Sequence, residues 1–305
     1  MMLRVATFAM NDRMLTASMK TQAKMAEMQL QQASGLVSTD YSGISQTART
    51  LINLEVSMQR AQTFENSAKE ANYRVETMGT QVGIMADLLT KYRSQITAMR
   101  STDRNPQTAQ TLIDAAEANL VQMGNLLNST YGGRYLFGGS VTTSPPVDVK
   151  GAYAATDPFG GPTAAYYQGD DMESLVQVST DHTVQYGVRA NEAAFEKALR
   201  SMKMLAEASP TMTDAELEAA FTLASQALDG VTVIQSRLGV TSGILKSAAE
   251  SQAEYQYYVD LNVTNIKEVD AAEVAVQLAT YETQLNASYA ALAKIQSVSL
   301  MDYLS

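Results

Sequence analysis

Residues 268–304 read EVDAAEVAVQLATYETQLNASYAALAKIQSVSLMDYL, and the rest of the architecture follows from this stretch. Only Glu282 and Lys294 are charged between Val274 and Met301. Apolar residues recur there with the three- and four-residue spacing of one helix face. Because a helix with so little charge is poorly suited to standing alone in water, we expect partners on several of its sides. The apolar face consists of Val274, Leu278, Tyr281, Leu285, Leu292 and Ile295.

The other end of the chain carries a matching stripe. Val5, Phe8, Leu15 and Met19 repeat with helical spacing, and Ser34-Gly35 predicts the end of that helix. Two apolar stripes at the two chain ends predict that the first and last helices pair antiparallel. We expect both stripes to form an assembly interface with neighbouring subunits, composed of Val5, Phe8, Leu15, Met19, Leu278, Tyr281, Leu285, Leu292 and Ile295.

Proline marks where long helices can form. Residues 1–105 and 211–305 contain none of the six prolines, so neither arm has an internal helix breaker. Apolar periodicity runs through residues 51–99 and again through 217–258. We therefore expect a mainly α protein: an elongated rod of long antiparallel helices formed by both chain ends, with a small β-rich domain inserted at the tip.

The middle of the chain has a strand-like sequence pattern. Residues 174–179 and 183–188 alternate with β-branched residues and predict strands, and Tyr166-Tyr167 predicts a third. Helix starts are predicted at Asn105-Pro106, Thr213 and Asp270 from their capping residues. The expected domains are a terminal one (1–40 with 265–305), a helical rod (41–135 with 190–264) and a β-rich tip (136–189).

Composition narrows the classes of function. The formal net charge is −10, which argues against non-specific nucleic-acid binding. Cysteine is absent, so disulfides, thiolate metal sites and cysteine nucleophiles are excluded. No apolar run is long enough to suggest membrane insertion, and the N-terminus does not read as a cleaved signal peptide. These features fit a cytosolic protein, and equally one exported by another route.

The glycine-rich stretch YGGRYLFGGS (131–140) lacks the order of a phosphate-binding loop and does not precede a helix. It lies between a predicted helix and the proline-rich segment. We therefore interpret it as a hinge to the tip domain, formed by Gly132, Gly133, Arg134, Tyr135, Phe137, Gly138 and Gly139.

Few side chains are candidates for catalysis or metal binding. His182 is the only histidine, and Asp170, Asp171 and Glu173 follow a predicted strand without EF-hand spacing. A hydrolase or metal-dependent enzyme built on Asp170, Asp171 and His182 is the alternative from another class. Since no nucleophile, base and orienting group come together, we expect no enzyme and no cofactor.

Four segments resemble the flagellin superfamily. They are QQASG (31–35), residues 43–89, GGRYLFGGSVTTSPPV (132–147) and residues 268–304, whose SLMDYL ending is closer to the hook-associated members than to flagellin. The resemblance covers both helical arms, and the third and fourth segments are its specific parts.

The resemblance implies a structural protein of the bacterial flagellum. It implies export through the flagellar type III channel without a cleaved signal peptide, and a cytosolic export chaperone that covers the C-terminal helix. It further implies end helices that order on assembly, and as partners the first hook-associated protein, flagellin and other copies of the chain. Flagellin itself, the bulk filament subunit, stays open as the alternative.

Overall fold

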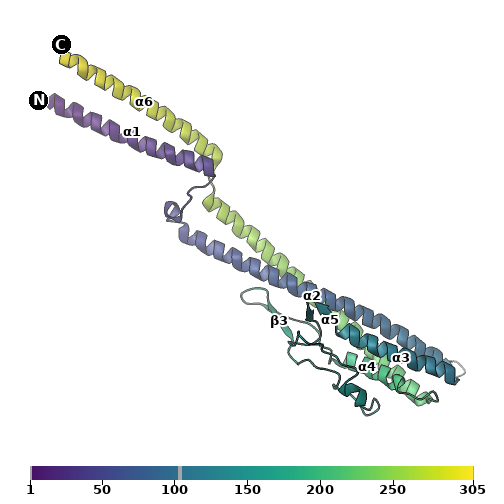
Figure 1. The fold of residues 1–305 in the computed structure, drawn as a ribbon. Coiled ribbons are helices and arrows are strands. Elements are labelled where there is room, and N and C mark those ends of the chain that lie inside the picture. The colour runs from purple at the N-terminus through teal and green to yellow at the C-terminus, as the bar shows by residue number, and fades with distance from the viewer. Residues whose placement is uncertain (1, 102–104, 305) are drawn as a thin grey trace. The chain divides into compact units, whose positions relative to one another are not determined.

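The computed structural model describes the backbone of residues 2–101 and 105–304, and the side chains of residues 9–100 and 105–294 (Figure 1). The chain divides into two compact units. One unit comprises Met1–Arg60 with Tyr255–Ser305, and the other comprises Ala61–Glu254. Long helices with a small β region confirm the mainly α class. The three-domain division expected from the sequence stays a prediction.

The first unit is built around the two ends of the chain. Helix α1 (Met2–Ser34) and helix α6 (Ala271–Leu304) lie side by side and run antiparallel, as predicted (Figure 1). The unit also contains the first turns of α2 (Ala48–Ser101) and the last turns of α5 (Asp214–Lys267). A 3₁₀ turn, η1 (Tyr41–Ile44), lies in the connector between α1 and α2.

The two connectors of this unit are joined by backbone hydrogen bonds. Gly35 ends α1 with a φ of 72°, in the left-handed region that glycine adopts most easily. The Val37 amide donates to the Lys267 carbonyl at 2.8 Å, and the Val269 amide donates to the Gly35 carbonyl at 3.0 Å. Leu36 and Glu268 therefore form an antiparallel bridge where both chain segments change direction.

The second unit has one hydrophobic core formed by four helices. These are the remaining parts of α2 and α5, with α3 (Pro106–Leu127) and α4 (Ala193–Ala206). Asn105 caps α3 through a reciprocal capping box with Pro at the first turn, as predicted. The buried face of α2 also matches the predicted periodicity, and it consists of Val75, Met78, Val82, Met85, Leu89, Tyr92 and Ile96.

The β region is smaller than the sequence suggested. Strands β1 (Thr130–Tyr131) and β2 (Arg134–Tyr135) form one hairpin, and β3 (Ser174–Gln177) and β4 (Thr183–Tyr186) form another, both antiparallel. The strand predicted at Tyr166-Tyr167 is wrong, because only Tyr167 pairs, in a single bridge with Val147. The intervening residues form loops and one 3₁₀ turn, η2 (Ala152–Ala155).

An aromatic pair fixes the β region to the helical core. Phe137 and Phe195 are fully buried, and their rings meet edge to face with centroids 6.2 Å apart and planes at 73°. The Ala190 amide donates to the Phe137 carbonyl at 2.9 Å. The segment that follows the first hairpin is therefore held on the start of α4.

We expect Phe137→Ala to destabilise this unit by about 3–5 kcal/mol, because it leaves a cavity against Phe195. Denaturant unfolding followed by circular dichroism measures the change. Phe159→Ala is the matched control, because Phe159 is exposed and should cost little. Equal losses for the two variants would contradict the assigned packing.

Candidate assembly interface

The C-terminal stripe faces the partner helix within the chain. Val274 and Leu285 are buried, while Leu278, Tyr281 and Leu292 are half-buried on the same face of α6. This face lies against α1, so the pairing of the two chain ends already covers much of it. The predicted interface residue Ile295 lies outside the residues whose side chains are described.

The N-terminal stripe does not face α6. Leu15 is 52% exposed and Met19 is 61% exposed, whereas Met14 and Ser18 lie on the face that is turned toward the chain interior. One residue along a helix corresponds to a rotation of about 100°, so the predicted stripe flanks the α1–α6 contact instead of forming it. The side chains of Val5 and Phe8 lie outside the described part.

Polar groups occupy the covered face of α1. Ser18 is only 3% exposed, and its hydroxyl has no hydrogen-bond partner among the described residues. The Asn11 side-chain oxygen, one heptad earlier, is buried and unpaired in the same way. Sequence reasoning missed these two residues, although polar side chains seven residues apart beside an apolar stripe were the available signal. The α1–α6 pair thus covers these two polar side chains together with Met14, and leaves Leu15 and Met19 exposed.

An ionic cluster ties the connector to the first turns of α2 and the end of α5. The Lys267 ammonium donates to one Glu55 carboxylate oxygen, and the Tyr41 hydroxyl donates to the other at 2.9 Å. The hydrogen bond from Lys267 lowers the pKa of Glu55, and the same bond raises the pKa of Lys267. This cluster lies directly beside the bridge of Leu36 and Glu268.

The glycine-rich stretch splits into two parts. Gly132 and Gly133 have φ values of 57° and 75° and form the two-residue turn between β1 and β2, which requires positive φ at both positions. Arg134 is exposed and Tyr135 half-buried, and Leu136, Phe137 and Gly138 are buried. Gly139 has a φ of 72° and lies against the Asp170 side chain. Whether the stretch acts as a hinge stays a prediction.

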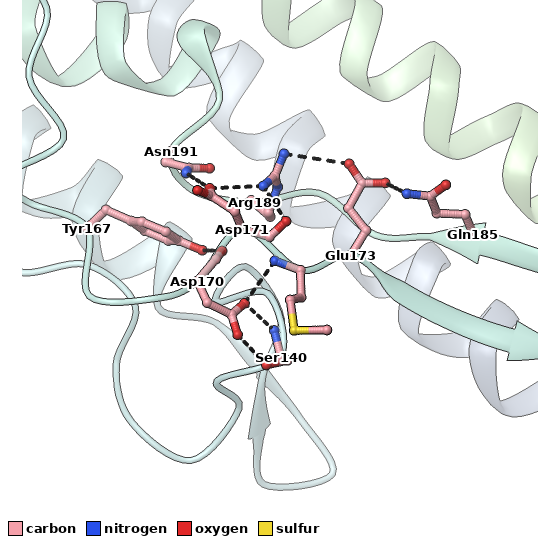
Figure 2. A network of polar contacts seen from close by, with 9 residues as sticks. Ser140, Tyr167, Asp170, Asp171, Glu173, Gln185, Arg189 and Asn191 are labelled. Carbon is pink, nitrogen blue, oxygen red and sulfur yellow. Dashed lines mark hydrogen bonds and ion pairs between the residues drawn. The ribbon is translucent and has the colours of Figure 1, made fainter.

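Asp170 closes the loop that follows this stretch. Its carboxylate accepts from the Ser140 amide at 2.8 Å, the Ser140 hydroxyl, and the Met172 amide at 3.2 Å (Figure 2). The Tyr167 hydroxyl donates to the Asp170 carbonyl at 2.7 Å. The hydrogen bonds from Ser140 lower the pKa of Asp170, and burial raises the pKa of Tyr167 to about 12.

The neighbouring acidic residues are bound to Arg189. Its guanidinium contacts the Asp171 carboxylate at 3.0 Å and the Glu173 carboxylate at 3.6 Å, and Asn191 also donates to Asp171 (Figure 2). The contacts of Asp171 and Glu173 with Arg189 hold this loop in place.

His182 lies exposed in the turn before β4. Among the described residues no group of three or more His, Asp or Glu side chains could hold a metal ion.

A buried lysine holds the outer part of the insert. Lys203 of α4 is 2% exposed and donates to the carbonyls of Tyr153, Ala154 and Thr156 around the end of η2. Its ammonium also lies 4.7 Å from the centre of the Tyr153 ring. One cation thus replaces the solvent that these carbonyls would otherwise need.

The geometry defines a class of protein: a helical subunit whose two chain ends pair and leave apolar surface uncovered. Residues 221–304 match the family of the bacterial flagellin C-terminal helical region. That match includes most of α5 and all of α6, the helices that bring the C-terminal end back to α1.

Solved structures with the same fold extend the comparison to most of the chain. A structure assigned to a flagellar hook-associated protein of Vibrio parahaemolyticus aligns with a TM-score of 0.61 and 15% identity, and covers 75% of this chain and 99% of its own. Bacillus cereus FlgL aligns with a TM-score of 0.55 and 17% identity over 70% of this chain and 99% of its own. The chain therefore shares the fold of these two structures over most of its length.

No curated protein sequence matched the chain. None of the described helices combines the length and the apolar content needed to cross a bilayer.

We expect Asp170→Asn to lower the melting temperature of the second unit, since the amide is a weaker acceptor for Ser140. A lowered pKa means that the contribution is complete above the usual carboxylate pKa and is lost as pH falls through the folded-state value. The difference from the parent protein should therefore stay constant from neutral pH down to about pH 4 and shrink only below that. Asp181→Asn is the control, and a difference independent of pH would contradict the assignment.

Replacing Lys203 by Met keeps most of the side-chain volume and removes the donor. We expect a loss of about 1–3 kcal/mol in unfolding free energy, because the carbonyls around η2 lose their partner. Hydrogen exchange should rise first in residues 152–156. Lys197→Met on the same helix provides the comparison. A Lys203→Met protein of unchanged stability would contradict the stabilising role of the Lys203 hydrogen bonds.

Proposed function

We propose that this chain is a structural component of the bacterial flagellum that joins a hook-associated protein to the first flagellin layer at the hook–filament junction. In this role it corresponds to the third hook-associated protein. The observation that carries the proposal is the antiparallel pairing of α1 with α6, in a chain whose 221–304 segment resembles the flagellin C-terminal region. Its mechanism is the burial of apolar surface between subunits, with no chemical step.

The exposed stripe of α1 supports assembly as the function. Leu15 and Met19 stand one helix turn apart outside the α1–α6 contact. Apolar side chains repeated along a helix at this spacing are covered when a further helix packs beside them. We therefore propose that Leu15 and Met19 of one copy pack against the end helices of neighbouring copies. Val5 and Phe8 of α1 and Ile295 of α6 are proposed to belong to the same interface.

The partners follow from this role. The first hook-associated protein lies on one side of the proposed ring, flagellin on the other, and further copies of the chain beside it. We also propose export through the flagellar type III channel, with a cytosolic chaperone on the C-terminal helix until secretion. The weakly charged α6 is the segment that most needs such cover, because its apolar face is partnered only by α1 in the isolated chain.

Flagellin is the second candidate, since the family matched by residues 221–304 is a flagellin family. The two alternatives differ in amount, because a filament subunit vastly outnumbers a junction subunit. The structures of flagellar hook-associated protein and FlgL favour the junction role. Quantifying the chain against the main protein of sheared filaments separates the two.

The double variant Leu15→Glu, Met19→Glu should be exported normally and fail to join the flagellum. Charged side chains on the stripe cannot be buried against a neighbouring helix without a large desolvation cost. Cells should then release flagellin into the medium and lose motility, which a swimming assay and a blot of culture supernatant measure. Lys20→Gln, Lys24→Gln changes the net charge equally on exposed positions of the same helix. Normal filaments with the glutamate variant would refute the assigned interface.

A further inference from the structure

A second apolar stripe lies on the first turns of α2. Ile52 and Val56 are 45% and 49% exposed, and Arg49 and Arg60 continue the same line at steps of three and four residues. Leu51, which is fully buried, lies on the opposite side of the helix. The outer α2 face (Arg49, Ile52, Val56, Arg60) is thus an aliphatic pair between two cations.

The last turns of α5 carry a different outer surface. Tyr257, Tyr258 and Leu261 are 69%, 66% and 45% exposed, while Val259 between them is 1% exposed. A step of two residues rotates a helix by about 200°, so Tyr257 and Leu261 both point away from the side that Val259 buries. With exposed Asp260 they form the outer α5 face (Tyr257, Tyr258, Asp260, Leu261), which is aromatic and acidic.

The two faces are complementary in chemistry. Guanidinium groups such as those of Arg49 and Arg60 stack on tyrosine rings and pair with carboxylates, and Ile52 and Val56 fit an aromatic and leucine surface. Within the described residues, the side chains of Arg49, Arg60 and Asp260 make no hydrogen bond or ion pair that would occupy them. Each face therefore retains the groups that the other one needs.

The two faces lie on different sides of the helix pair. In this unit Glu55 of α2 binds Lys267 of α5, and the buried residues Leu51 and Val259 lie on the sides opposite the outer faces. The outer faces therefore point away from the pair in different directions. A surface and its complement on separate sides of one chain produce a head-to-tail contact between copies, which closes into a ring or continues as a helix.

We infer that the outer α2 face of one copy docks on the outer α5 face of a second copy of this chain. The inference deepens the proposed function, on which it rests, by naming a lateral contact distinct from the stripe on α1. Copies would then be joined side by side by residues 49–60 and 257–261, while the end helices make their own contacts.

The absence of cysteine allows a direct test by cross-linking. The variant Val56→Cys, Leu261→Cys carries one thiol on each face, and the two faces lie on different sides of the helix pair. Mild oxidation of the full-length variant, both as concentrated purified protein and in isolated flagella, should give a ladder of covalent multimers. The single variants Val56→Cys and Leu261→Cys should give no ladder, and Val56→Cys, Val276→Cys controls for exposed thiols that are not predicted to meet.

The outcomes separate this inference from the proposed function. Flagella that contain the double variant but yield no ladder would overturn the lateral contact and leave the junction role standing. A ladder from the purified protein alone would support the contact even if the chain were missing from flagella. A single variant that cross-links to a different flagellar protein, or to itself, would assign the face to that partner or to a symmetric contact, and would also overturn the inference.

Discussion

The structure depends on one mismatch: the pairing of the two chain ends covers the apolar face of α6 but leaves the apolar stripe of α1 uncovered. Pairing α1 with α6 buries the stripe that contains Leu285 and leaves Leu15 and Met19 in solvent. The same pairing encloses the Asn11 and Ser18 side-chain oxygens without partners among the described residues. Because apolar exposure and unpaired polar atoms both raise the free energy of the isolated chain, the end helices are better satisfied when neighbouring helices surround them.

The second unit is organised around a core of its own, although it also exposes apolar side chains such as Val233 and Val240. Its helices share one hydrophobic core, and the insert is fixed by Phe137 against Phe195, by the Asp170 loop and by the Lys203 ammonium. One unit is therefore built around a core shared by several elements, whereas the other is built around a single pair of end helices. In the proposed role, the end helices are the part that neighbouring subunits complete.

The sequence alone predicted the long helices and several helix starts. The absence of proline from both arms and the helical spacing from Leu51 to Met99 predicted the long helices, and Asn105 and Thr213 predicted two helix starts. The sequence could not predict which face of α1 packs against α6. The spacing of Leu15 and Met19 defines an apolar stripe but does not identify the helix that covers it. The hydrogen bonds of Lys203 were also not predicted, since the partner of its ammonium group is a backbone carbonyl fifty residues away, and a backbone carbonyl carries no signal in the sequence.

The proposed role places this chain at the boundary between hook and filament. Immunogold electron microscopy of intact flagella, with a tag on the exposed turn at residues 180–182, tests it most directly. We predict a single band of label where hook meets filament. Label along the whole filament would identify a bulk filament subunit instead, and flagella without label would contradict the proposed role.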